Sequence, residues 1–122
     1  MSDVSGRDLR GPWVPLDDRS VGALSGALGV FQIADPAGDV LQVGYAGGRS
    51  LFGLRGTLRS ALDRSDGRPL VFRVEVNMQY MSRWKELLMV HRAQHGSLPI
   101  LNNPDDAHGL GHMGPRTKGG DQ

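Results

Sequence analysis

Apolar positions along the chain gather in short runs, and turn-forming residues separate these runs. Two β-rich runs, residues 30–34 and 40–45, flank the sequence DPAGD. In such a turn proline fixes φ, and glycine permits a positive φ. The pattern therefore predicts a β-hairpin.

A helix and a third strand are predicted after the hairpin. Ser50 is suited to be the N-cap of a helix whose leucines recur at helical spacing, at Leu51, Leu54, Leu58 and Leu62. Residues 70–76 alternate and are rich in valine, which is typical of a strand.

A second helix is predicted over residues 78–95. Asn77 is suited to begin this helix and Gly96 to end it, and one apolar stripe runs along it through Met81, Trp84 and Leu88. The order strand, strand, helix, strand, helix predicts an α/β (α+β) fold, in which two helices cover a three-stranded sheet.

The polar ends of the chain indicate its domain organisation. At 122 residues the chain has room for one domain, which we assign to residues 20–103. We expect residues 1–19 to be a flexible lead-in and residues 104–122, which are low in apolar content, to be a disordered tail. The lead-in has apolar residues that could anchor it to the core: Trp13, Val14 and Leu16.

Composition excludes several kinds of site. The chain has no cysteine, so it forms no disulfide and no cysteine-ligated zinc site.

It has no apolar run of membrane-spanning length and no signal-peptide pattern, so we expect a cytoplasmic protein without a membrane partner. The pairs His91/His95 and His108/His112 have i, i+4 spacing, but no carboxylate accompanies them at a suitable distance, and we expect no zinc site.

Positive charge is concentrated in one segment. The formal net charge is +1, yet residues 49–73 contain six arginines and two aspartates. Arginine suits phosphate because its planar guanidinium donates two hydrogen bonds at once. A solvated surface is the alternative interpretation of the same charges.

The two strands of the predicted hairpin carry a recognisable pair of triplets. Gly29-Val30-Phe31 opens the first strand, and Gln42-Val43-Gly44 lies in the second. With the helices that follow, residues 27–103 resemble a GIY-YIG nuclease domain, whose first strand carries Gly-Ile-Tyr and whose second carries Tyr-Ile-Gly. The resemblance implies a GIY-YIG-like fold.

The resemblance also implies a set of site residues. The arginine of the family would be Arg55, with Arg49 as the alternative; the metal-binding glutamate would be Glu86, and the closing asparagine Asn102. Glu86 would hold Mg²⁺ or Mn²⁺, and the arginine would stabilise charge on a phosphodiester during its hydrolysis.

Both signature tyrosines are replaced, by Phe31 and Gln42. Phenylalanine has no hydroxyl, and glutamine cannot act as a base near neutral pH. Tyr45 is a poor substitute, since three residues along a strand it points to the opposite face from Gln42. We therefore expect a nucleic-acid-binding domain in which Phe31 and Gln42 stand at catalytic positions and cleavage is lost or weak.

The expected nucleic-acid contacts are Arg49, Arg55, Arg59 and Asn102, with DNA favoured over RNA. The alternatives are an active endonuclease that uses Glu86 and Arg55, and a non-catalytic domain whose second helix contacts a protein partner. Glu86 has an alternative of its own, an ion pair with Arg83, three positions earlier on the same helix. Asn102 has the alternative of a turn residue. The oligomeric state stays open.

Overall fold

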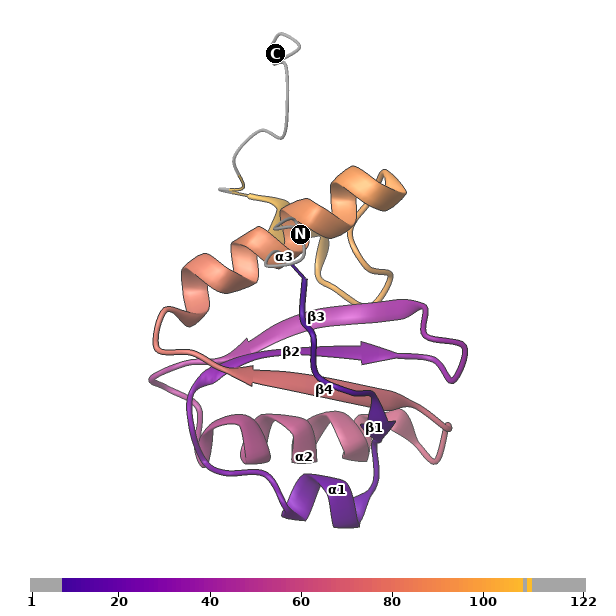
Figure 1. Ribbon diagram of the computed structural model, residues 1–122, viewed down its shortest axis with the longest axis vertical. Helices are drawn as coiled ribbons and strands as arrows, with labels where there is room; N and C mark the ends of the chain where they lie inside the picture. Colours follow the sequence, from indigo (N-terminus) through magenta and orange to yellow (C-terminus); the bar gives the residue numbers. More distant parts are fainter. Residues whose placement is uncertain (1–7, 109, 111–122) are drawn as a thin grey trace, which may run out of the picture.

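The computed structural model describes residues 8–108 and 110. Its elements in chain order are β1 (Val14–Pro15), α1 (Asp18–Gly22), β2 (Gly29–Ala34), β3 (Val40–Ala46), α2 (Gly53–Ser65), β4 (Val71–Val76), α3 (Tyr80–His95) and the 3-10 helix η2 (Pro104–Ala107). Residues 29–95 follow the predicted order of strand, strand, helix, strand and helix. Figure 1 shows α3 on one face of the sheet, with α1 and α2 on the other.

The sheet has four strands, so the prediction of three was wrong. β1 pairs with β4 through Val14↔Phe72 and Pro15↔Val71, and the strand order is β1-β4-β2-β3 with antiparallel neighbours throughout. A strand of two residues is too short for apolar alternation to reveal it. Pro15, which has no N–H to donate, is tolerated because β1 lies at the edge of the sheet.

The central strand β2 is buried at all six positions, because both faces of the sheet are covered. On one face Phe31 and Ile33 join a core cluster that includes Leu54, Leu58 and Phe72. On the other face Val30 joins a second cluster, with Leu9, Val43, Leu87 and Leu88. Successive residues of β2 therefore contact opposite layers of the molecule.

The two triplets lie side by side on paired strands, which confirms the predicted hairpin. The register places Phe31 opposite Gly44 and Gly29 opposite Ala46. A Cβ at position 44 would overlap the Phe31 ring, and a Cβ at position 29 would overlap the carbonyl oxygen of Glu75 on β4. Both glycines are thus required by close approach within the sheet.

The helix α2 begins later than predicted. Phe52, the residue before α2, and Gly53, its first residue, have φ angles of 62° and 56°, in the left-handed region, so right-handed helical backbone begins only after them. The Ser50 hydroxyl oxygen accepts a hydrogen bond from the backbone N–H of Gly47 at 3.1 Å instead of capping the helix. The helix α3 ends as predicted, at Gly96, with a φ of 84°.

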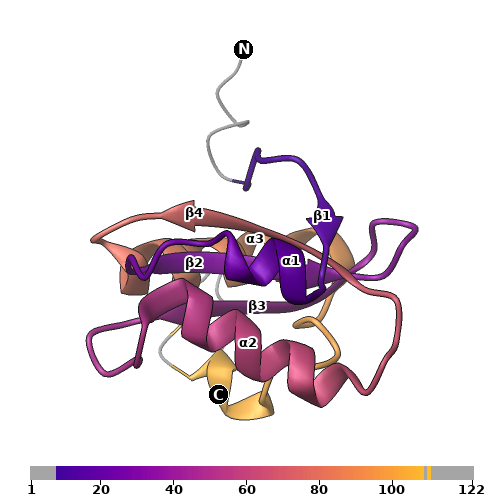
Figure 2. The same cartoon turned by 90° about the horizontal axis from the view of Figure 1, so that it is seen from below.

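Residues before β2 pack against the domain. Leu9 and Leu16 are buried, and the guanidinium of Arg73 lies 4.2 Å from the centre of the Trp13 ring. Figure 2 shows α1 beside α2 on the same face of the sheet. Residues 1–7 of the predicted lead-in, and 109 and 111–122 of the predicted tail, lie outside the described residues.

Within the described ranges, no helix has both the length and the apolar character needed to cross a membrane.

We predict that Gly29→Ala lowers the free energy of unfolding by about 2 kcal/mol, because β4 must move away from the new methyl group. Gly22→Ala is the matched control, since nothing lies within 4 Å of a Cβ at that position. Urea denaturation of both variants measures the difference. Equal stability of the two variants would contradict the close approach of β2 and β4.

Candidate functional site

The two residues at the signature tyrosine positions lie on the α2 side of the sheet, in different settings. Phe31 is 2% exposed and belongs to the core. Gln42 is half-buried and lines a cavity of about 240 Å³ together with Arg64 and Arg68. Tyr45 stacks on Tyr80 of α3, with 5.7 Å between ring centroids, so it faces away from Gln42 as the alternation of the strand predicts.

Arg55 and Arg59 project from α2 toward the α1 region. The Nη1 of Arg55 donates a hydrogen bond to the Leu24 carbonyl at 3.3 Å. Arg59 forms an ion pair with Asp18 of α1. Both side chains are at least partly exposed, so an ion pair of this kind contributes at most about 1 kcal/mol to stability.

A shallow groove of about 570 Å³ runs along α2, and Arg49, Arg59 and Arg64 line it. Hydroxyl groups of Ser50, Thr57 and Ser60 line the same groove. Arg64 also lines the Gln42 cavity, so the groove and the cavity adjoin. We call the arginines of this region the α2 arginine surface: Arg49, Arg55, Arg59, Arg64 and Arg68.

Arg64 and Arg68 were not assigned to the site from sequence, although both were counted in the basic segment. Their closeness to Gln42 depends on how the end of α2 and the following turn lie against β3. Residue spacing along the chain does not reveal that contact.

Glu86 lies on α3, in the other layer of the molecule. Its Oε1 accepts a hydrogen bond from Nη1 of Arg83 at 2.7 Å, which is the ion pair that was the alternative interpretation of this residue. The sheet separates α3 from α2 (Figure 1). The structure therefore does not bring Glu86 together with Arg55, Phe31 or Gln42.

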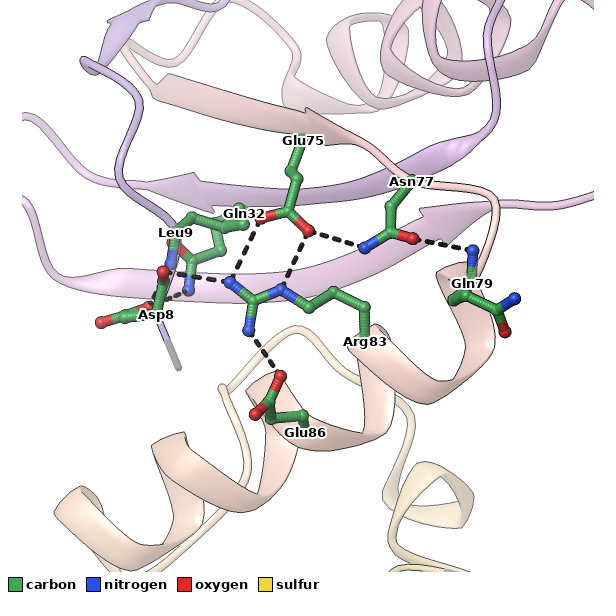
Figure 3. A network of polar contacts seen from close by, with 8 residues as sticks. All are labelled: Asp8, Leu9, Gln32, Glu75, Asn77, Gln79, Arg83 and Glu86. Atoms are coloured by element: carbon green, nitrogen blue, oxygen red, sulfur yellow. Dashed lines mark hydrogen bonds and ion pairs between the residues drawn. The ribbon is translucent and has the colours of Figure 1, made fainter. Parts of the chain in front are cut away.

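Arg83 is the centre of a polar network on the α3 side of the sheet (Figure 3). Its side chain is 9% exposed, and its Nε donates to Oε2 of Glu75 at 3.0 Å. Its Nη2 donates to Oε1 of Glu75 at 3.2 Å and to the Asp8 carbonyl at 3.0 Å. Asn77 adds a hydrogen bond from its Nδ2 to Oε2 of Glu75 at 3.0 Å, and its own Oδ1 accepts from the N–H of Gln79.

The network shifts two pKa values in the direction that favours the charged forms. Burial alone would raise the pKa of Glu75, but hydrogen bonds from Arg83 and Asn77 and the charge of Arg83 outweigh burial and lower it. Burial alone would lower the pKa of Arg83, but its bonds to Glu75 and Glu86 raise it. Glu75, eight residues before Arg83 and on β4, was not singled out from sequence.

The surroundings of Glu86 do not fit a divalent cation, because one of its carboxylate oxygens already forms an ion pair with the positively charged guanidinium of Arg83. Within residues 8–108 and 110, no three His, Asp or Glu side chains come together in a group that could hold a metal ion.

The histidines of α3 contact each other, with 4.3 Å between the ring centroids of His91 and His95. Nδ1 of His91 lies 3.0 Å from the Ser97 carbonyl oxygen. Burial lowers the pKa of His91, and the nearby His95 adds to this effect. His112 lies outside the described residues.

Asn102 covers the exposed edge of β3. Its Oδ1 accepts from the N–H of Val43 at 2.8 Å, and its Nδ2 donates to the Val43 carbonyl at 2.9 Å and to Oδ2 of Asp106 at 2.8 Å. The side chain thus pairs with the strand as a neighbouring backbone would, which blocks addition of another strand at this position. Both the oxygen and the nitrogen of the Asn102 amide, which was expected to contact nucleic acid, are therefore already hydrogen-bonded within the protein.

We predict that the Glu75–Arg83 pair makes stability depend on acid pH. Because the folded-state pKa of Glu75 is lowered, the stabilisation is present above the unfolded value of about 4.5 and is lost as the pH falls through the folded value. Urea denaturation of the wild type and Glu75→Gln between pH 7 and pH 3 measures it. The stability advantage of the wild type should shrink below about pH 4.5; an advantage that is constant with pH would contradict the pairing.

The family comparison agrees with the extent of the folded region. The DUF7508 family, described as a domain of unknown function, matches residues 8–94, which run from the start of the described chain almost to the end of α3. No curated protein matches the chain. No solved structure matches it either. Since the match spans well over half of the sequence, the chain belongs to the DUF7508 family.

Proposed function

We propose that this domain binds nucleic acid through the α2 arginine surface, that its fold is GIY-YIG-like, and that phosphodiester cleavage is lost or weak. The guanidinium groups of Arg49, Arg64 and Arg68 belong to exposed residues and have no hydrogen-bond or ion-pair partner in the part of the chain that the structure describes. Unpaired guanidinium groups along one surface are suited to successive phosphates.

The distribution of acidic residues supports an anionic ligand. None of the described residues that line the α2 groove or the Gln42 cavity is acidic. Asp63, which lies within the same basic segment, instead lines a third cavity with Asp17 and Asp18, and Arg68 lines both this cavity and the Gln42 cavity. The lining of the groove and of the Gln42 cavity thus combines positive charge with hydroxyl and amide groups.

The GIY-YIG-like part of the proposal is supported by topology and by register. The order of β2, β3, α2, β4 and α3 is the order of the family landmarks, and the two triplets lie on adjacent antiparallel strands. The glycine of each triplet has a steric reason within the sheet, at Gly29 and at Gly44.

The positions and chemistry of three residues support the loss of cleavage. Phe31 is buried and lacks a hydroxyl, so it offers no proton donor or acceptor to a ligand. Gln42 is accessible, but its amide does not act as a base. Glu86 forms an ion pair with Arg83 on α3, and the sheet separates this pair from the α2 arginine surface.

We predict that a fluorescein-labelled oligonucleotide binds with an affinity that falls steeply with salt, because binding releases counterions from phosphate. Arg64→Gln combined with Arg68→Gln should weaken binding about tenfold and reduce the slope of log affinity against log salt by about 2. Fluorescence anisotropy measures both quantities.

The control is Lys85→Gln, which removes one positive charge from α3, on the other face of the sheet, and is compared with Arg64→Gln alone, which also removes one. An equal loss of affinity in this control would show that only net charge matters. Absence of binding by the wild type would overturn the proposal and move the function toward a protein partner.

We also predict that the protein does not nick plasmid DNA efficiently in Mg²⁺ or Mn²⁺, compared with the same incubation in EDTA. Agarose gel electrophoresis of the plasmid separates nicked from supercoiled forms. Metal-dependent nicking that disappears in Glu86→Ala would instead support the active endonuclease, with Glu86 released from Arg83 when substrate binds.

A further inference from the structure

Phe52 is a large aromatic residue on the surface between the arginines of α2. It is 68% exposed. It lines the α2 groove with Arg49 and Arg64, and it lines a second concavity with Arg55 and Arg59. The ring therefore lies among four of the five members of the α2 arginine surface.

The backbone holds Phe52 in a conformation that aromatic residues avoid. Its φ of 62° and ψ of 19° lie in the left-handed region, where a Cβ is crowded by the backbone. Asparagine or glycine would occupy this position at lower cost. A strained residue persists only where its surroundings fix it, and such residues concentrate at functional sites.

The surroundings that fix Phe52 come from the loop before β2. The N–H of Leu54 donates to the Ala27 carbonyl at 2.8 Å, and the N–H of Arg55 donates to the Ser25 carbonyl at 3.3 Å. Gly53 lies so close to the Gly26 carbonyl that a Cβ there would overlap it. These contacts hold the start of α2 against residues 25–27, while the Phe52 side chain stays outside the core.

The combination of an exposed ring with the guanidinium groups of Arg49 and Arg64, which have no partner among the described residues, is chemically specific. Arginines suit any polyanion, but an aromatic face adds affinity only where the ligand presents flat surfaces between its charges. The bases of a duplex are stacked on each other and hidden from such a ring. The bases of a single strand are free to stack on it.

We infer that Phe52 is a stacking platform for a base of single-stranded nucleic acid, with phosphates on the flanking arginines. This inference rests on the proposed function and adds the substrate class. The adjacent Leu51, 78% exposed, extends the apolar surface beside the ring.

The test compares three labelled probes by anisotropy: a short oligothymidylate, an abasic strand with the same number of phosphates, and a duplex of the same length. The wild type should bind the oligothymidylate about tenfold more tightly than the abasic strand. Phe52→Asn should remove this preference and leave affinity for the abasic strand unchanged. Phe52→Trp, which keeps an aromatic face, should retain the preference.

Thermal unfolding of the same variants separates a binding role from a structural one. Phe52→Asn relieves the left-handed strain, so its melting temperature should equal or exceed that of the wild type while base-dependent affinity falls. A lower melting temperature together with weaker binding of every probe would overturn the inference in favour of a structural role.

Two outcomes distinguish the inference from the proposed function. If all probes bind alike, and Phe52→Asn changes nothing while Arg64→Gln with Arg68→Gln weakens binding, the stacking role fails and the arginine surface stands. If no probe binds, or if polyglutamate competes as well as the oligothymidylate, the proposed function fails and the inference fails with it.

Discussion

The central strand β2 is buried on both faces of the sheet, with α3 on one face and α1 and α2 on the other. Each of its six residues is buried, and because side chains alternate along a strand, successive residues pack into opposite layers of the molecule. Phe31 and Ile33 belong to the α2 layer and Val30 to the α3 layer. The sheet therefore acts as a partition between α2 and α3, and groups on these helices belong to separate surfaces (Figures 1 and 2).

This partition explains why the residues implied by the GIY-YIG resemblance have different roles here. On the α3 side, Glu86 helps to neutralise Arg83, a cation whose burial is compensated chiefly by the two oxygens of Glu75. On the α2 side, the guanidinium groups of Arg49, Arg64 and Arg68 stay exposed, with no partner among the described residues. A structural ion network and the proposed nucleic-acid-binding surface can thus coexist in a small domain without neutralising each other.

The regular part of the fold was predictable from sequence because its signals are local. The DPAGD turn, the leucine spacing of α2 and Gly96 each act within a few residues of the element they define. β1 was missed because its two residues are specified by pairing with Phe72 and Val71, far along the chain. The role of Asn102 depends on Val43, 59 residues away, and Glu75 meets Arg83 only after the chain turns from β4 into α3. The exposed position of Phe52 could not be predicted either, because its backbone conformation follows from the contacts of α2 with residues 25–27.

We propose that nucleic acid contacts the α2 arginine surface and not the Glu86 side of the sheet. Titration of a short oligothymidylate into the isotopically labelled protein, followed by two-dimensional amide NMR, distinguishes these two surfaces. We expect chemical-shift changes confined to residues 47–68 and the adjoining part of β3, with α3 unaffected. Changes centred on residues 83–86 of α3, or spread evenly over both layers, would contradict the proposal.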